Sequence, residues 1–159
     1  MQLPSLMPGV AGAKEVYAIA VIRQDSSVAV PPEALDRFEI REGDPVLLVT
    51  SHPGEAGFGL ISPRMAKGTV LDALFDGVTD DLLARSGKRW KVLARLKGGR
   101  LRLLPDALKA FGLREGERLL VIKGAAAAVA YVPVEIWKRK LAEKGFEQAI
   151  RNMEKLREI

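Results

Sequence analysis

The stretch "LREGERLLVI" at residues 113–122 decides the fold, because it nearly repeats "IREGDPVLLV" at residues 40–49. When the chain is laid over itself at this offset of 73 residues, residues 17–51 match residues 90–124. The matches include prolines, phenylalanines and both REG triplets: Pro32 with Pro105, Phe38 with Phe111, Arg41-Glu42-Gly43 with Arg114-Glu115-Gly116, and, further on, Phe58 with Tyr131. A similarity this long indicates a tandem repeat.

The sequence pattern of each copy predicts a ββαββ unit. A short turn, "DSS" or "GG", separates the first two strands, and a proline then opens a short helix, where its fixed φ and missing N–H are tolerated. Gly43 and Gly116 end the REG turn, where glycine takes a positive φ without steric cost. The expected helices are 32–38 and 105–111. The expected strands are 17–23, 28–30, 46–50, 57–61, 90–97, 100–104, 119–123 and 129–132.

The size of the repeat gives a reason for the duplication. A unit of roughly 45 residues buries too little surface to be stable alone. We therefore expect the copies to be related by a pseudo-twofold axis and to interleave their hairpins in a common barrel without free strand edges. The expected fold class is mainly β with short helices (α+β). The expected organisation is a flexible segment 1–13, repeat 1 at 14–65, a helical connector at 66–87, repeat 2 at 88–133, and C-terminal helices at 134–159.

The composition excludes several classes of protein. The chain has 159 residues, of which 48% are hydrophobic, and it carries a net charge of +5. It has no cysteine, which excludes disulfides and thiolate chemistry and is typical of a reducing compartment. No apolar run approaches the roughly 20 residues that span a bilayer, and the N-terminal residues show no export signal. We expect a cytoplasmic protein without membrane contact.

The order strand, turn, strand, proline, short helix, "GLREGERLLV" resembles the SpoVT/AbrB swapped-hairpin superfamily of DNA-binding proteins. The stretch "GGRLRLLPDALKAFGL" at 98–113 is similar to the glycine-arginine, strand, proline, helix signature of that superfamily. Two copies in one chain, with a connector and a tryptophan-bearing C-terminal helix, are similar in layout to the MraZ family. Three of the four residues of the two Asp-x-x-x-Arg motifs of MraZ are missing here. In the second copy Arg100 matches the arginine but Leu96 stands in place of the aspartate, and in the first copy Arg23 and Ser27 occupy the two positions.

Seven cations and no acidic residue lie from Lys88 to Arg102. Strand alternation places Lys91, Arg95 and Lys97 on one face and apolar side chains on the other. A two-stranded ribbon can enter the major groove, where arginine can donate to guanine O6/N7 and lysine can pair with phosphate. The resemblance implies DNA contact by Arg95, Lys97, Arg100 and Arg102, and the charge pattern extends the predicted DNA-binding set to Lys88, Arg89 and Lys91. The alternative is a solvated strand edge that charge keeps soluble.

The first hairpin, "YAIAVIRQDSSVAV", is apolar on both faces, with Arg23 and Lys14 as the nearby cations. We expect both of its faces to be buried, so that the second copy supplies the DNA face. The expected partner is double-stranded DNA. A homodimer or higher homo-oligomer of whole chains would present two basic hairpins, matching a palindrome or doubling nonspecific affinity.

The connector and the tail predict helices. Residues 68–87 fit two short helices that break near Asp76-Gly77, with Thr79 as the N-cap of the second. The residues expected to face inward are Val70, Leu71, Leu74 and Val78. An acidic surface of Asp72, Asp76, Asp80 and Asp81 is either a partner or effector site or a solvated helix face.

The tail fits a helix from about 134, a stop at Gly145, and an amphipathic helix that follows it. The apolar stripe of this second helix comprises Phe146, Ala149, Met153 and Leu156. It either packs on the chain's own core or forms a dimer.

No pattern in the sequence supports a catalytic function. His52 is the single histidine of the chain, and with Glu55 it supplies too few ligands for a metal site. "DGVTDD" and "KGGRLR" lack the lysine and spacing of a phosphate-binding loop. We expect no enzyme activity and no cofactor. Two alternatives to DNA binding stay open: an antitoxin-like protein-interaction module, and a small-ligand-binding barrel, suggested by the alanine-rich "GAAAAVA" strand.

Overall fold

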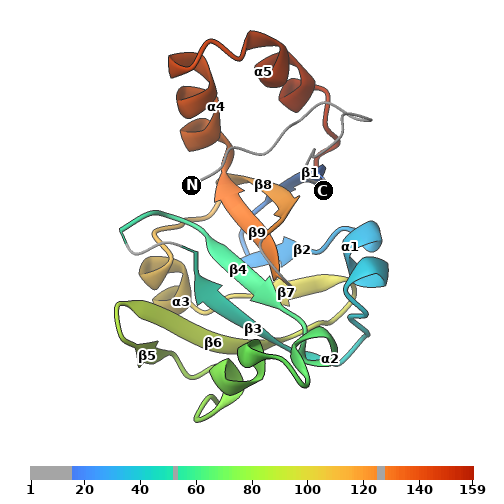
Figure 1. The fold of residues 1–159 in the computed structure, drawn as a ribbon, viewed down its shortest axis with the longest axis vertical. Coiled ribbons are helices and arrows are strands. Elements are labelled where there is room, and N and C mark those ends of the chain that lie inside the picture. Colours follow the sequence, from blue (N-terminus) through green and yellow to red (C-terminus); the bar gives the residue numbers. More distant parts are fainter. Residues whose placement is uncertain (1–15, 52–53, 125–127) are drawn as a thin grey trace.

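The computed structural model describes residues 16–51, 54–124 and 128–159, and it is built mainly of β-strands with short helices, as expected (Figure 1). Strands 1 to 4 and the first two helices belong to the first half of the chain. In chain order the elements are β1 (Val16–Val21), β2 (Ser27–Ala29), α1 (Pro32–Arg37), β3 (Pro45–Thr50), β4 (Phe58–Ile61), α2 (Pro63–Ala66), the 3₁₀ helix η1 (Val70–Phe75), β5 (Ala84–Ser86), β6 (Arg89–Arg95), β7 (Arg100–Arg102), α3 (Pro105–Ala110), β8 (Arg118–Lys123), β9 (Ala128–Pro133), α4 (Val134–Glu143) and α5 (Glu147–Glu154).

The strands form one large antiparallel sheet and one small ladder. The seven-stranded sheet has the order β1-β8-β9-β4-β3-β6-β5, and β2 pairs with β7 in the two-stranded ladder. Every strand of one repeat pairs with a strand of the other repeat: β1 lies beside β8, β3 beside β6, β2 beside β7, and β4 beside β9. Each copy therefore contributes its first strand to the other copy's half of the sheet, and the second strands of the two copies pair in the ladder.

Two cross-strand pairs mark the centre of the pseudo-twofold arrangement. Val28 lies opposite its own repeat equivalent, Leu101, and Phe58 lies opposite its equivalent, Tyr131. The rings of Phe58 and Tyr131 are stacked, with centroids 4.7 Å apart. The buried phenol of Tyr131 donates a hydrogen bond of 2.9 Å to the carbonyl of Ala29, and burial raises its pKa.

The first strands depart from the 73-residue offset. Leu48 lies opposite Val92, whereas its equivalent Val121 lies opposite Ala18, so Ala18 corresponds to Val92 at an offset of 74. The turn of the first hairpin is one residue longer than that of the second. The correct equivalent of Arg23 is therefore Lys97, and the simple overlay that placed Arg23 on Leu96 was wrong there.

The repeated REG triplet binds each hairpin to the opposite copy. The amide of Gly43 donates to the carbonyl of Leu96 over 2.7 Å, and the amide of Gly116 donates to that of Ile22 over the same distance. Both glycines have a positive φ, 83° and 82°, which aims their amides at the crossing strand. Beside the first contact, the Glu42 carboxylate accepts a 2.6 Å hydrogen bond from the amide of Gly98. The same short motif occurs twice because the same junction occurs twice.

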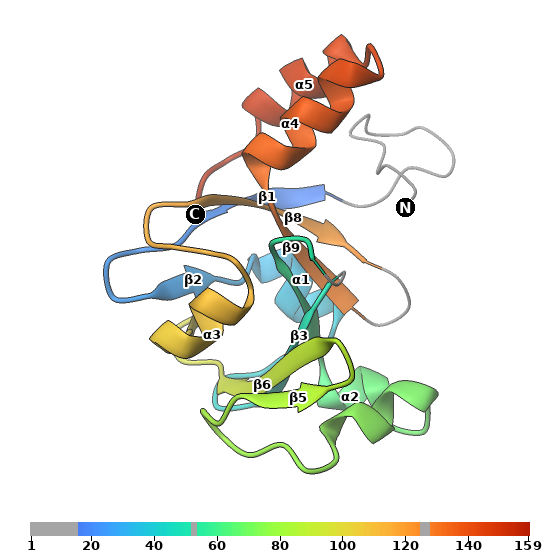
Figure 2. The ribbon, with the colours of Figure 1, turned by 90° about the vertical axis from the view of Figure 1, so that its left-hand side faces the viewer.

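Three apolar clusters arise from strand alternation. The central core gathers one face of the sheet strands with the ladder and the two proline-led helices, including Phe38 of the first copy and Phe111 of the second. The other face of β1 and β8 packs under α4 and α5, around Trp137 and Met153. The other face of β3 and β6 packs under α2, η1 and the residues after them. Figure 2 shows these two covers at opposite ends of the molecule. One face of the apolar first hairpin lies in the central core and the other lies under the tail helices, so both faces are buried, as predicted.

One edge of the large sheet is covered by the C-terminal residues, and the other ends in the three-residue strand β5. Beside β1, residues 157–159 run as a short parallel segment, and the amide of Ile19 donates to the carbonyl of Arg157 over 2.9 Å. At the other edge β5 pairs with β6, and Asp80 forms a bridge with Leu93. A covered edge, and an edge strand of only three residues, offer little template for pairing with another chain.

The connector differs from its prediction. The predicted second helix, with Thr79 as its N-cap, is wrong. The strand β5 forms in this stretch instead and pairs with β6, whose backbone groups on that side would otherwise be unpaired. Val70 is 90% exposed and does not face inward, although Leu71, Leu74 and Val78 pack on the outer cluster. The 3₁₀ helix places three consecutive residues around its axis, so only part of the stripe can reach the sheet.

The tail agrees with the prediction except at one residue. Ala149, Met153 and Leu156 pack on the chain's own core, whereas Phe146 precedes α5 and is 49% exposed. The segment 1–13 lies outside the described residues. Within the described part of the chain, no helix is both long and apolar enough to cross a bilayer.

Candidate nucleic-acid interface

The hairpin of β6 and β7 presents its cations as strand alternation dictates, with one exception. Val92, Ala94 and Leu96 point into the central core, and Arg95 and Lys97 are exposed on the other face. Across the turn, Leu101 and Leu103 are buried while Arg102 is exposed. The apolar face anchors the hairpin, so the cationic face does not have to contribute to folding.

Lys91 is the exception, and its assignment to the DNA-binding face was wrong. Lys91 is only 8% exposed, because η1 and the residues after it cover this part of β6. The ammonium group donates hydrogen bonds to two backbone carbonyls, of Leu74 at 2.9 Å and of Asp76 at 3.3 Å. Lys91 therefore fastens the connector to the sheet.

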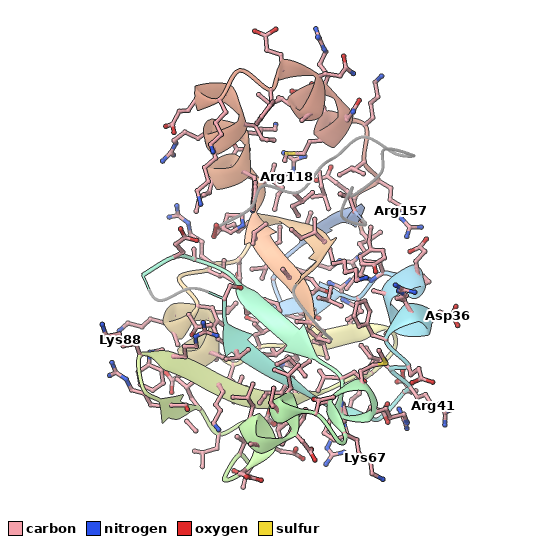
Figure 3. The ribbon with its side chains drawn as sticks, viewed as in Figure 1. Asp36, Arg41, Lys67, Lys88, Arg118 and Arg157 are labelled. Atoms are coloured by element: carbon pink, nitrogen blue, oxygen red, sulfur yellow. The ribbon has the colours of Figure 1, made fainter. Side chains whose placement is uncertain are left out.

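Lys88 and Arg89 lie at the other end of β6 from the hairpin turn. Both are exposed at its start, whereas Lys97 follows its end. In Figure 3, Lys88 projects on the opposite side of the molecule from Arg41, whose REG turn binds the hairpin near its tip. Apart from the buried Lys91, the predicted cations are thus divided between the two ends of β6, and Lys88 and Arg89 do not extend the hairpin surface.

Arg95, Lys97 and Arg102 lie together along one cleft of about 280 Å³. The other residues along this cleft are Asp80, Asp81, Leu93 and Leu104. The described residues provide no hydrogen bond or ion pair to the side chains of Lys97 and Arg102, so both ammonium and guanidinium groups point to solvent. Three cations face two carboxylates here, which leaves an excess of positive charge.

Arg100 lies on the ladder between the two copies. Its guanidinium donates to the hydroxyl of Ser27 at 2.8 Å and to the carbonyl of Ser27 at 3.0 Å. Burial, followed by repulsion from Arg23, lowers the pKa of Arg100, and Asp25 opposes this shift. Arg23 and Arg100 belong to different repeats, and Ser27 contacts both: its carbonyl accepts hydrogen bonds from the amide of Arg23 at 3.0 Å and from the guanidinium of Arg100 at 3.0 Å.

Arg23 and Asp80 were not in the predicted site. Arg23 precedes the first turn, as its equivalent Lys97 precedes the second, so each hairpin carries one cation before its turn. The longer first turn hid this equivalence in a comparison at constant offset. Asp80 belongs to the predicted acidic surface, but its ion pair with Arg95, 2.8 Å long, depends on the path of the connector, which the sequence pattern misassigned as a helix.

The other sequence candidates gather no site. His52 lies outside the described residues, and Glu55 is exposed and forms an ion pair with Lys140 at 3.3 Å. Among residues 16–51, 54–124 and 128–159, no three histidine or acidic side chains could hold a metal ion together. A comparison of the sequence with protein-family models gives no match, and a comparison with curated proteins gives none.

Proposed function

We propose that this protein binds double-stranded DNA as a transcriptional regulator of the SpoVT/AbrB type, using the turn region of its β6–β7 hairpin. The proposed contact surface consists of Arg23, Arg95, Lys97, Arg100 and Arg102. The observation that carries the proposal is the ladder of β2 and β7, in which a neutral hairpin from one copy supports a cationic hairpin from the other. The pairing of strands from different copies supports the swapped-hairpin arrangement that the sequence resemblance implies.

The charge of the surface suits a polyanion. Within the part of the chain that the structure describes, Lys97 and Arg102 have no side-chain partner, so they can approach a phosphate without first breaking a contact. Arg100 is held by Ser27 in a fixed orientation, and a fixed guanidinium fork suits bidentate recognition of a guanine edge or a phosphate. The surface is small, which favours an assembly of two or more chains on one duplex.

Salt-dependent binding tests the proposal. A fluorescein-labelled, mixed-sequence duplex of about 20 base pairs is titrated with protein at several salt concentrations, and anisotropy gives the affinity. Binding through Z phosphates makes log K fall with log salt with a slope of about −0.9Z. We expect the double variant Lys97→Ala/Arg102→Ala to bind roughly ten-fold more weakly at moderate salt, since exposed charge contacts contribute up to about 1 kcal/mol each. Its salt slope should be shallower by about two.

The matched control removes two exposed cations from the tail, Arg139→Ala/Lys144→Ala, and should bind almost as the wild type does. Equal losses in both double variants would mean that only net charge matters and that the hairpin is not the site. Absence of duplex binding by the wild type at low salt would refute DNA binding itself.

A further inference from the structure

The cleft beside β7 contains an internal competitor for anions. Its three cations, Arg95, Lys97 and Arg102, face Asp80 and Asp81. The Asp80 carboxylate accepts a hydrogen bond from Nε of Arg95 at 2.8 Å, while Nη1 of the same guanidinium donates to the carbonyl of Gly43 at 3.1 Å. One carboxylate therefore occupies the position on Arg95 that a phosphate oxygen would take.

The backbone, rather than a long side chain, places this carboxylate. Asp80 forms a parallel bridge with Leu93, and the amide of Asp81 donates to the carbonyl of Leu93 at 3.1 Å. Lys91 fastens the preceding residues through the carbonyls of Leu74 and Asp76. The connector thus passes over the edge of β6 at one fixed position, and the aspartate reaches Arg95 with only one methylene group.

The pair is weak enough to be exchanged. The side chains of Arg95 and Asp80 are 47% and 46% exposed, and exposed ion pairs of this kind are worth little because water and salt screen them. A phosphate can replace the carboxylate at small cost while the bond from Arg95 to Gly43 stays in place. Leu93 and Leu104 line the same cleft, and they offer apolar contact to the sugar that carries the phosphate.

We propose that this cleft binds a single phosphate group of a polyanion backbone, and that Asp80 occupies Arg95 until the phosphate displaces it. The inference rests on the proposed function, which it deepens by naming the phosphate subsite and its competitor. Asp80 lowers the affinity for every duplex equally, because backbone phosphates carry no sequence information. The first hairpin has no equivalent subsite, since Val21 stands at the position equivalent to Arg95.

The decisive variant is Asp80→Asn, compared with Glu143→Gln, which removes the same charge from the exposed end of α4 at the far end of the molecule (Figure 1). In the anisotropy titration, Asp80→Asn should bind the mixed-sequence duplex about two- to five-fold more tightly than wild type, the change that corresponds to one exposed ion pair. Glu143→Gln should change the affinity by less than two-fold. Thermal unfolding followed by circular dichroism checks that both variants stay folded.

Arg95 must mediate the effect. Arg95→Ala should weaken binding, and adding Asp80→Asn to it should give no further gain, because the interaction being removed is already absent. An equal gain from Asp80→Asn in the presence and absence of Arg95 would overturn the inference, as would equal gains from Asp80→Asn and Glu143→Gln.

A second probe separates this inference from the proposed function. Inorganic phosphate is added to 15N-labelled protein, and the Nε–Hε resonance of Arg95 is followed by NMR. A shift at Arg95 that saturates at lower phosphate concentration in Asp80→Asn supports the anion subsite, even if no duplex binds and the proposed function fails. Duplex binding with no response of Arg95 to phosphate or to Asp80→Asn would overturn the inference and leave the proposed function standing.

Discussion

At the scale of single residues, the two copies differ at one position after the proline-led helix. Gly112 and its equivalent Glu39 both have a positive φ, 68° and 54°. In each copy the next amide reaches back to the helix: Ile40 donates to the carbonyl of Leu35 at 2.9 Å, and Leu113 to that of Leu108 at 2.8 Å. This backbone form suits glycine after a helix, and it strains a residue with a Cβ atom.

The difference predicts opposite effects of exchanging the residues. Gly112→Ala should lower the free energy of unfolding by roughly 1–2 kcal/mol, because the left-handed region is costly for alanine and the new Cβ would lie 3.3 Å from the Cβ of Ala56. Glu39→Gly should raise the free energy of unfolding by up to about 1 kcal/mol. Denaturant unfolding measures both, and a Gly112→Ala variant as stable as the wild type would contradict this reading of the two turns.

At the scale of secondary-structure elements, the exchange of strands between repeats is the organising feature. Val21 of β1 lies opposite Arg118 of β8, and residues opposite each other in antiparallel strands are close enough for a disulfide. Because the chain has no cysteine, Val21→Cys/Arg118→Cys introduces a single possible bridge. It should form within one chain on mild oxidation and raise the free energy of unfolding by about 2–4 kcal/mol.

Repeats folded side by side would instead pair the first strand with the third strand of the same copy. Pro45 is the repeat equivalent of Arg118, so Val21→Cys/Pro45→Cys is the matched control, and its thiols should stay reduced. Non-reducing electrophoresis and thiol counting distinguish the variants. Bridging of the control pair, or covalent dimers alone from the first pair, would show that the strands are not exchanged within the chain.

At the scale of the whole molecule, the local periodicity of the sequence predicted the strands, the helices and their buried faces well, but it did not predict where the covering segments lie. The repeat, the proline-led helices and the buried and exposed faces of the second hairpin all follow from alternation and turn chemistry, which are properties of neighbouring residues. The burial of Lys91 depends on η1, which crosses a face that looked free in the strand pattern. The contact of Asp80 with Arg95 depends on where the connector turns back, and a sequence period carries no information on that path.

The whole molecule is also lopsided in a way that bears on function. The tail covers one half of the sheet with an apolar cluster, and the connector covers the other half (Figure 2). Near the turn of the second hairpin, Lys97 and Arg102 remain exposed. Three of the cations there, Arg95, Arg100 and Arg102, have the neutral residues Val21, Ser27 and Ala29 as their equivalents in the first copy. The symmetric scaffold therefore presents an asymmetric charge.

Amide chemical-shift mapping of the 15N-labelled protein with an unlabelled mixed-sequence duplex tests this charge assignment most directly. The expected result is a set of perturbed amides confined to the two hairpin turns and the cleft: residues 23–27, 80–81 and 95–102. Perturbations centred on the tail helices, or at the Lys88 end of β6 without the turn, would contradict the hairpin as the DNA-contacting surface.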